Sequence, residues 1–135
     1  MTTPLNELTH GELSLICAHL MGIQVINILI DMDKRPYAVI ALEHGDTSRY
    51  EPLEECERGN AQALNLVFAF NVSTSYSIDN GYTLAVSNED KSITATANGS
   101  QPLETMLRAI VLANVGEHID VNYFIHRALN LDEVA

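Results

Sequence analysis

The chain has 135 residues, enough for one domain with a sizeable core, and 47% of them are hydrophobic, which excludes global disorder. With 18 Asp and Glu against 7 Lys and Arg, the formal net charge is −11, so phosphate backbones are repelled and direct nucleic-acid binding is not expected. No apolar run is long enough for a membrane span, and no basic segment precedes an apolar one at the N-terminus, so we expect a cytoplasmic protein without membrane contact.

The first predicted helix opens on a capping box, Thr9-His10-Gly11-Glu12, in which a hydroxyl and a carboxylate each bind a backbone N–H. One apolar stripe continues from there until Gly22 ends the helix. The segment Ile23–Ile30 is apolar on both faces and rich in β-branched residues, so we expect a buried strand. Its expected hairpin partner is Tyr37–Leu42.

The segment Glu43–Gly59 is polar, charged and irregular, which predicts a solvated loop. Its glutamates are a candidate for acid–base chemistry or metal binding, but such clusters on loops usually serve neither purpose. They are Glu51, Glu54, Glu55 and Glu57. Asn60 then caps a second predicted helix with one apolar face. That face consists of Ala63, Leu64, Val67 and Phe68.

The clearest pattern lies between Asn71 and Gly116, where we predict a meander of three strands followed by a helix. The strands are Val72–Ile78, Tyr82–Ser87 and Ser92–Ala97, and the tight turns 79–81 and 88–91 join them. Strict alternation gives the sheet one mostly apolar face and one face lined with hydroxyls. The apolar face has Val72, Thr74, Tyr76, Ile78, Tyr82, Leu84, Val86, Ile93, Ala95 and Ala97. The other face has Ser73, Ser75, Ser77, Thr83, Ala85, Ser87, Ser92, Thr94 and Thr96.

The helix after the meander begins at Pro102, and Gly116 caps its C-terminus. Its buried residues follow helical spacing: Leu103, Met106, Leu107, Ile110 and Val111. A short fourth helix is predicted within Asp120–Asn130, packed on the domain or on another subunit. Because we expect the domain to be complete by Gly116 without this tail, we predict a homo-oligomer.

These elements predict an α+β fold. A mostly antiparallel sheet, made of the central three-stranded meander and an N-terminal hairpin, is packed by three to four helices. We expect a single domain over residues 1–135, with its core at about residues 9–116 and a C-terminal helical tail at 117–135.

The sequence has no phosphate-binding glycine loop, nucleophile elbow or metal-binding His/Cys pattern. The cysteines Cys17 and Cys56 fall in no metal or redox spacing and are expected to be reduced packing residues. His118-Ile119-Asp120 pairs a histidine with an acid, but no nucleophile accompanies it. We therefore expect no catalytic residues, no cofactor and no metal, and a protein that is not an enzyme.

Several residues are candidates for ligand binding, and each also has an ordinary structural explanation. Ser100 opens the third helix and Asn60, with Arg58 beside it, opens the second, where unpaired amide groups attract anions but capping residues are common. Arg49-Tyr50 places a charge beside an aromatic plane. Arg108 has Glu104 four residues earlier, so a surface ion pair also explains it. Thr94 represents the hydroxyl-rich face, which is either wet or bound to a ligand. The full set is Arg49, Tyr50, Arg58, Asn60, Thr94, Ser100 and Arg108.

Two stretches of the chain carry a family resemblance. The first is Tyr50-Glu51-Pro52 followed by Asn60 and Ala63, and the second is Ala95-Thr96-Ala97 followed by Pro102-Leu103 and Met106–Val111. Together with the pattern of the N-terminal helix, they resemble small phage proteins of the phage α-β-α sandwich domain type and a related uncharacterised phage family, over about residues 9–116. The chain lacks the tryptophans frequent in that family, and its loop 43–59 is longer.

The resemblance implies a phage origin but carries no settled activity. We therefore expect a phage accessory protein in the host cell cytoplasm that binds rather than catalyses. The specific hypothesis is counter-defence by sequestration of a small nucleotide-like host signal, in a pocket at a subunit interface. The first alternative is an acidic inhibitor that imitates nucleic acid and binds a host defence protein, and the second is a nucleotide hydrolase.

Overall fold

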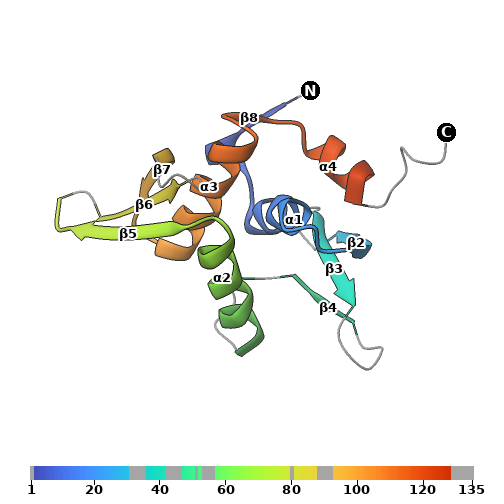
Figure 1. The fold of residues 1–135 in the computed structure, drawn as a ribbon. Helices are drawn as coiled ribbons and strands as arrows, with labels where there is room; N and C mark the ends of the chain where they lie inside the picture. Colours follow the sequence, from blue (N-terminus) through green and yellow to red (C-terminus); the bar gives the residue numbers. More distant parts are fainter. Residues whose placement is uncertain are drawn as a thin grey trace. The chain divides into compact units, whose positions relative to one another are not determined.

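A computed structural model of the protein describes residues 2–30, 36–41, 47–50, 52, 57–79, 81–87 and 93–128 (Figure 1). Within these ranges the side chains of some strand and helix ends, Arg49, Arg58 and Ile93 among them, lie outside the description. So do Cys56, most of the glutamate cluster, the turn 88–91 and the residues after 128. The fold is α+β with antiparallel sheets, as predicted. No helix among the described residues has the length and apolar character needed to cross a bilayer.

The chain forms two compact units, residues 1–51 with 118–135 and residues 52–117. The single domain, with a core at about residues 9–116 and a tail at 117–135, stays a prediction. The first unit holds a three-stranded antiparallel sheet in the order β2-β3-β4 and a short pair of strands, β1 and β8. Its elements are β1 (Thr3–Pro4), η1 (Leu5–Glu7), α1 (His10–Leu20), β2 (Val25–Ile30), β3 (Pro36–Ala41), β4 (Thr47–Arg49), β8 (His118–Ile119) and α4 (Val121–Ala128).

Helix α1 begins at the predicted capping box. The Thr9 hydroxyl accepts the Glu12 backbone N–H at 3.3 Å, and the Glu12 carboxylate accepts the Thr9 backbone N–H at 2.9 Å. Gly22, with φ +73°, follows its end as expected. Residues 12–18 are all buried, so the predicted single stripe is wrong and the helix is buried nearly all round. Contacts with β3 and α4 account for part of that burial.

The sheet of the first unit differs from prediction in two places. Ile26 and Leu29 are 43% and 41% exposed, so β2 is not buried on both faces. A register irregularity between Val25 and Asn27 accompanies this exposure, and an antiparallel sheet can leave one face in solvent. Strand β4, in the segment predicted as loop, pairs with β3 at the sheet edge. Short polar strands of this kind carry no hydrophobic alternation, so the sequence pattern did not reveal it.

The predicted fourth helix exists as α4 and packs on α1 of its own unit. The Asp120 carboxylate accepts the Tyr123 backbone N–H at 3.3 Å, which caps the helix start. Phe124 is 5% exposed, and its ring meets His19 of α1 edge to face with centroids 5.3 Å apart. The described part of the tail therefore has a packing role within the chain.

The second unit contains the predicted meander and helix. Its sheet is antiparallel in the order β5-β6-β7, with strands β5 (Val72–Ser77), β6 (Gly81–Ser87) and β7 (Ile93–Gly99). In the chain, α2 (Glu57–Ala69) precedes these strands and α3 (Pro102–Asn114) follows them. The register confirms the two faces over most of the sheet, since Leu84 lies opposite both Thr74 and Ala97. Gly81 has φ +73°, and a Cβ there would lie 2.8 Å from the Gly99 carbonyl oxygen, so glycine fits this hairpin end best.

Helix α3 packs on one face of the meander, where it contacts β6 and β7 (Figure 1). Met106, Leu107, Ile110 and Val111 are at most 2% exposed, as predicted, and Leu103 is half-buried. The helix has Pro102 in its first turn and ends before Gly116, whose φ is +125°. The Gly116 N–H donates to the Val111 carbonyl at 3.2 Å, which confirms the predicted cap.

Helix α2 is rotated relative to its predicted orientation. It begins at Glu57 rather than at Asn60, and Ala63 and Leu66 are the buried hydrophobic residues among its described side chains. Leu64 and Phe68, predicted to be buried, are 54% and 71% exposed. The apolar residues of this helix span more than one face, so their spacing alone does not select the packed one.

Candidate functional site

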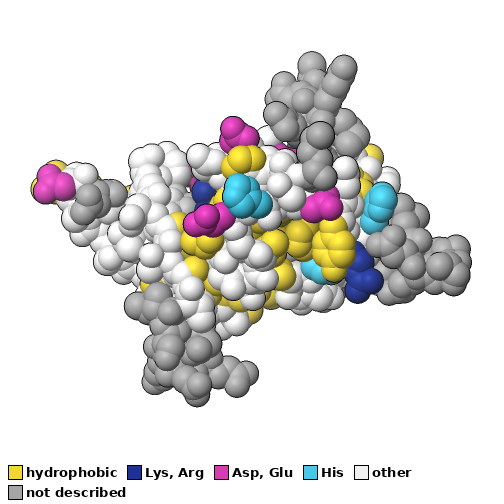
Figure 2. Space-filling model, turned by 90° about the horizontal axis from the view of Figure 1, so that it is seen from above, with side chains coloured by type: hydrophobic (Ala, Val, Ile, Leu, Met, Phe, Trp, Pro, Cys, Tyr) yellow, Lys and Arg dark blue, Asp and Glu magenta, His cyan; other side chains and the backbone are white. Residues whose placement is uncertain are grey.

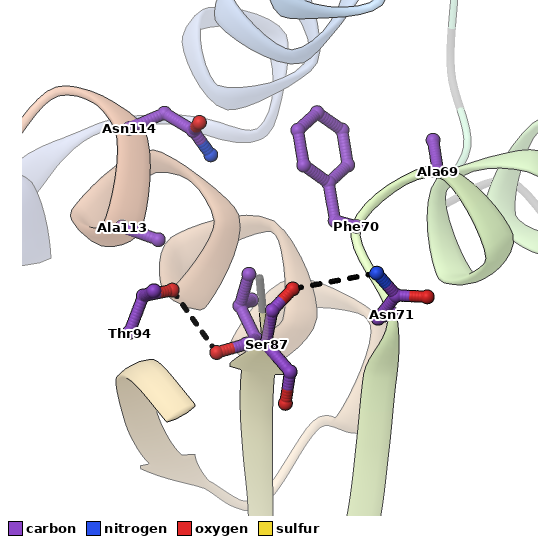
Figure 3. Close-up of a pocket in the computed structure, with 8 residues that line it drawn as sticks. Ala69, Phe70, Asn71, Ser87, Thr94, Ala113 and Asn114 are labelled. Atoms are coloured by element: carbon purple, nitrogen blue, oxygen red, sulfur yellow. Dashed lines mark hydrogen bonds between the residues drawn. The ribbon is translucent and has the colours of Figure 1, made fainter. Parts of the chain in front are cut away.

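A pocket of about 260 Å³ lies in the second unit, where the end of α2, the ends of β6 and β7 and the last turn of α3 meet (Figure 3). Its lining residues are Ala69, Phe70, Asn71, Val86, Ser87, Thr94, Ala113 and Asn114. They combine apolar side chains with amides and hydroxyls, and none of them is charged.

The corner between α2 and β5 forms one wall. Asn71 has φ +51°, a left-handed conformation that asparagine tolerates better than most residues, and it turns the chain from the helix into the strand. The Phe70 N–H donates to the Leu66 carbonyl at 3.1 Å, and the Phe70 carbonyl accepts the Ser87 N–H at 3.4 Å. The corner is therefore tied to the end of β6.

A β-bulge supplies the second wall. Val86 lies opposite Ala95 but Ser87 lies opposite Ile93, so Thr94 has no residue directly across from it. The Thr94 hydroxyl donates to the Val86 carbonyl at 3.0 Å (Figure 3). The prediction of uninterrupted alternation is wrong here, because one extra residue in β7 shifts the pattern at its start. Thr94 thereby comes to line the pocket.

The amide side chains are held through their N–H groups. Asn114 Nδ2 donates to the Ile110 carbonyl at 2.8 Å, and Asn71 Nδ2 reaches the Ser87 carbonyl at 3.5 Å. In Figure 3 the Asn114 amide points into the space between α3 and the α2–β5 corner. An amide fixed this way still presents its oxygen as an acceptor, and a second N–H remains on the same nitrogen.

This chemistry suits recognition of a small neutral polar group. Amides and hydroxyls can satisfy ring nitrogens, carbonyls and sugar hydroxyls, and Phe70 adds an aromatic side chain to the lining. Asn, Ser and Thr side chains do not exchange protons near neutral pH, so the lining residues that the structure describes supply no general acid or base. In the part of the chain that the structure describes, no three His, Cys, Asp or Glu residues gather as a metal site would require.

Of the seven predicted ligand residues, the pocket lining includes Thr94. Arg108 forms an ion pair with Glu104, whose Oε1 lies 2.8 Å from the Arg108 Nη2. This surface ion pair is the ordinary structural explanation that the sequence offered beside ligand binding. Ser100 is exposed and precedes the cap residue Gln101, whose side chain makes no capping bond. Asn60 is an exposed residue inside α2 and not its cap, because the helix starts earlier. For Arg49 and Arg58 the side chains lie outside the described part of the structure.

Tyr50 belongs to the core of the first unit rather than to a site. It is 1% exposed, and burial, with a smaller contribution from Cys17, raises the pKa of its phenol above the ordinary range. Burial likewise raises the pKa of the Cys17 thiol, so the reactive thiolate is disfavoured. Cys17 is a free, buried cysteine, as predicted for a packing residue.

Sequence reasoning missed Phe70, Asn71, Ser87 and Asn114. One signal was available, since an asparagine between a predicted helix and a predicted strand is a common left-handed helix terminator. The bulge at Thr94 and the position of Asn114 beside it depend on long-range pairing. No pattern within either element encodes that pairing.

Neither a scan of protein-family models nor a search of curated proteins finds a match to this chain. The phage-family resemblance therefore stays a prediction.

Figure 2 shows one face of the molecule, on which the described carboxylates lie apart from one another and the described Lys and Arg side chains are sparse.

Proposed function

We propose that the protein is a non-enzymatic binder that sequesters a small nucleotide-like molecule, with a base or sugar of that molecule in the pocket beside Thr94. The observation that carries the proposal is the chemistry of the described lining residues, which are uncharged and combine amides, hydroxyls and an aromatic ring in one pocket. These groups match the hydrogen-bonding edges of a nucleobase or ribose.

Size and charge favour the uncharged end of such a ligand. Pockets for drug-sized ligands are roughly 300–1,000 Å³, so about 260 Å³ suits a base or a sugar better than a whole dinucleotide. A phosphate would be repelled by a chain with net charge −11 and would gain no lysine or arginine from the described lining residues. We therefore assign the pocket to the nucleoside part and leave the phosphate outside it.

The biological setting follows from the resemblance to small phage proteins. In that setting the protein is a phage accessory protein in the host cytoplasm, and sequestration of a host signal serves counter-defence.

The net charge of −11 supports the second candidate, an acidic inhibitor that imitates nucleic acid. Binding to a basic host protein that weakens steeply with salt would favour this inhibitor over the small-molecule binder.

The test is a thermal melting series with nucleosides, mononucleotides and cyclic dinucleotides. A ligand at a hundred times its Kd stabilises the folded state by about 2.7 kcal/mol, which is a readily measured rise in Tm. We expect the rise to be lost in Thr94→Val, which removes the pocket hydroxyl but keeps the β-branched shape. The matched control is Thr96→Val, the same change two residues along β7 at an exposed position outside the pocket lining.

An equal Tm rise in both variants would show that the ligand binds outside the pocket. No rise with any member of the panel would reject a nucleotide-like ligand. Nucleotide turnover that is lost in His118→Ala or with a chelator would favour the hydrolase instead.

A further inference from the structure

Among the strands that the structure describes, β5 lies at the edge of the meander and pairs with β6 alone. Edge strands in natural proteins are usually protected from pairing by lysines, prolines, bulges or short length. Strand β5 extends over Val72–Ser77 without lysine, proline or any charge, and its register with β6 is regular. The other edge strand, β7, carries the bulge at Thr94 and contacts α3. The two edges therefore differ in their readiness to pair.

The described side chains of this strand are exposed on both faces of the sheet. Residues Ser73–Ser77 are all exposed. Tyr76 is 63% exposed while its ring lies 4.9 Å from that of Tyr82, and Ile78, just past the strand, is 92% exposed. An ordered aromatic side chain on an uncovered strand loses little conformational freedom when a partner arrives.

Charge identifies the kind of partner. No Asp, Glu, Lys or Arg occurs from Gly59 to Ile78, although charged residues make up 19% of the chain. Two copies with net charge −11 repel each other over most of their surface, and an uncharged strand is where they can approach. A basic partner would gain more from the acidic surface elsewhere.

We propose that β5 is the docking surface for a second copy of this chain, which adds its own β5 antiparallel across a two-fold axis. Such pairing is self-complementary, because it joins the Val72–Thr74–Tyr76 face to its equivalent and the serine face to its equivalent. The result is one continuous sheet through both copies, held by main-chain hydrogen bonds. This surface differs from the C-terminal tail expected to mediate association, since α4 packs on α1 within its own unit.

The test is the molar mass in solution of two variants with the same added charge. Ser75→Glu places a carboxylate on the β5 edge, and Thr96→Glu places one at an exposed position on β7. We expect light scattering at micromolar concentration to give twice the chain mass of 14.9 kDa for the native chain and for Thr96→Glu. Ser75→Glu should halve that mass while its circular dichroism stays native.

A monomeric native chain, a dimeric Ser75→Glu, or loss of the dimer in both variants would each overturn the proposal. If Ser75→Glu does not fold, hydrogen exchange of the native chain gives the answer. Amides of β5 should exchange more slowly in concentrated than in dilute solution, while those of α3 stay unchanged. Exchange of β5 that is independent of concentration would also overturn it.

Discussion

At the scale of single residues, Glu12 and Thr94 each combine a hydrogen bond with a second structural role. Glu12 is buried because its carboxylate completes the cap of α1. Thr94 both holds the Val86 carbonyl and lines the pocket. A Cβ at Gly99 would run into the Thr105 hydroxyl, which itself donates to the Gln101 carbonyl at 2.6 Å. Glycine at residue 99 thus permits the close approach of α3 to the sheet.

His19 gives a prediction at this scale. Burial, followed by the positive charge of Arg127, lowers the pKa of His19 below its ordinary value of 6.5. Below that ordinary pKa the unfolded chain binds the proton more readily than the folded one, so the free energy of unfolding falls as pH drops from about 7 to about 5.5. The free energy of unfolding, measured with urea, should fall less over this pH interval in His19→Gln than in the native chain. His126→Gln, an exposed control on α4, should keep the native drop, and an equal drop in all three would contradict the role of His19.

At the scale of elements, α3 packs on the meander through side chains that are almost fully buried. Leu107 is fully buried on α3, so Leu107→Ala should lower the free energy of unfolding by about 2–5 kcal/mol. Leu64→Ala on α2 is the matched control, because 54% exposure predicts a change within about 0.5 kcal/mol. Denaturant unfolding measures both. Similar losses for the two variants would show that α3 does not form the core of this unit.

Sequence patterns predicted the elements better than their contacts. The Thr9–Glu12 box and the caps around α3 were predicted because capping is local and depends on neighbouring residues. The meander was predicted because its period of two is unambiguous from Val72 to Ser77. The exposed face of α2 and the bulge at Thr94 were missed because each is selected by packing between segments far apart in the sequence. The bulge brings Thr94 to the pocket, and of the seven predicted ligand residues Thr94 lies in the lining.

At the scale of the whole molecule, charge and chemistry are unevenly distributed along the chain. The net charge of −11 comes from residues outside Gly59–Ile78, and that uncharged stretch contains both a pocket wall and the exposed edge strand β5. Acidic surface elsewhere favours solubility and discourages unspecific association. The second unit therefore contains both proposed binding surfaces, one for a small ligand and one for another copy.

The most direct test of the proposed function is native mass spectrometry of the protein purified from the cells that produce it. We expect an added mass in the nucleotide range, released on denaturation, retained in Thr96→Val and lost in Thr94→Val. A bare chain mass in the native protein, together with no rise in Tm across the nucleotide panel, would contradict a nucleotide-like ligand in this pocket.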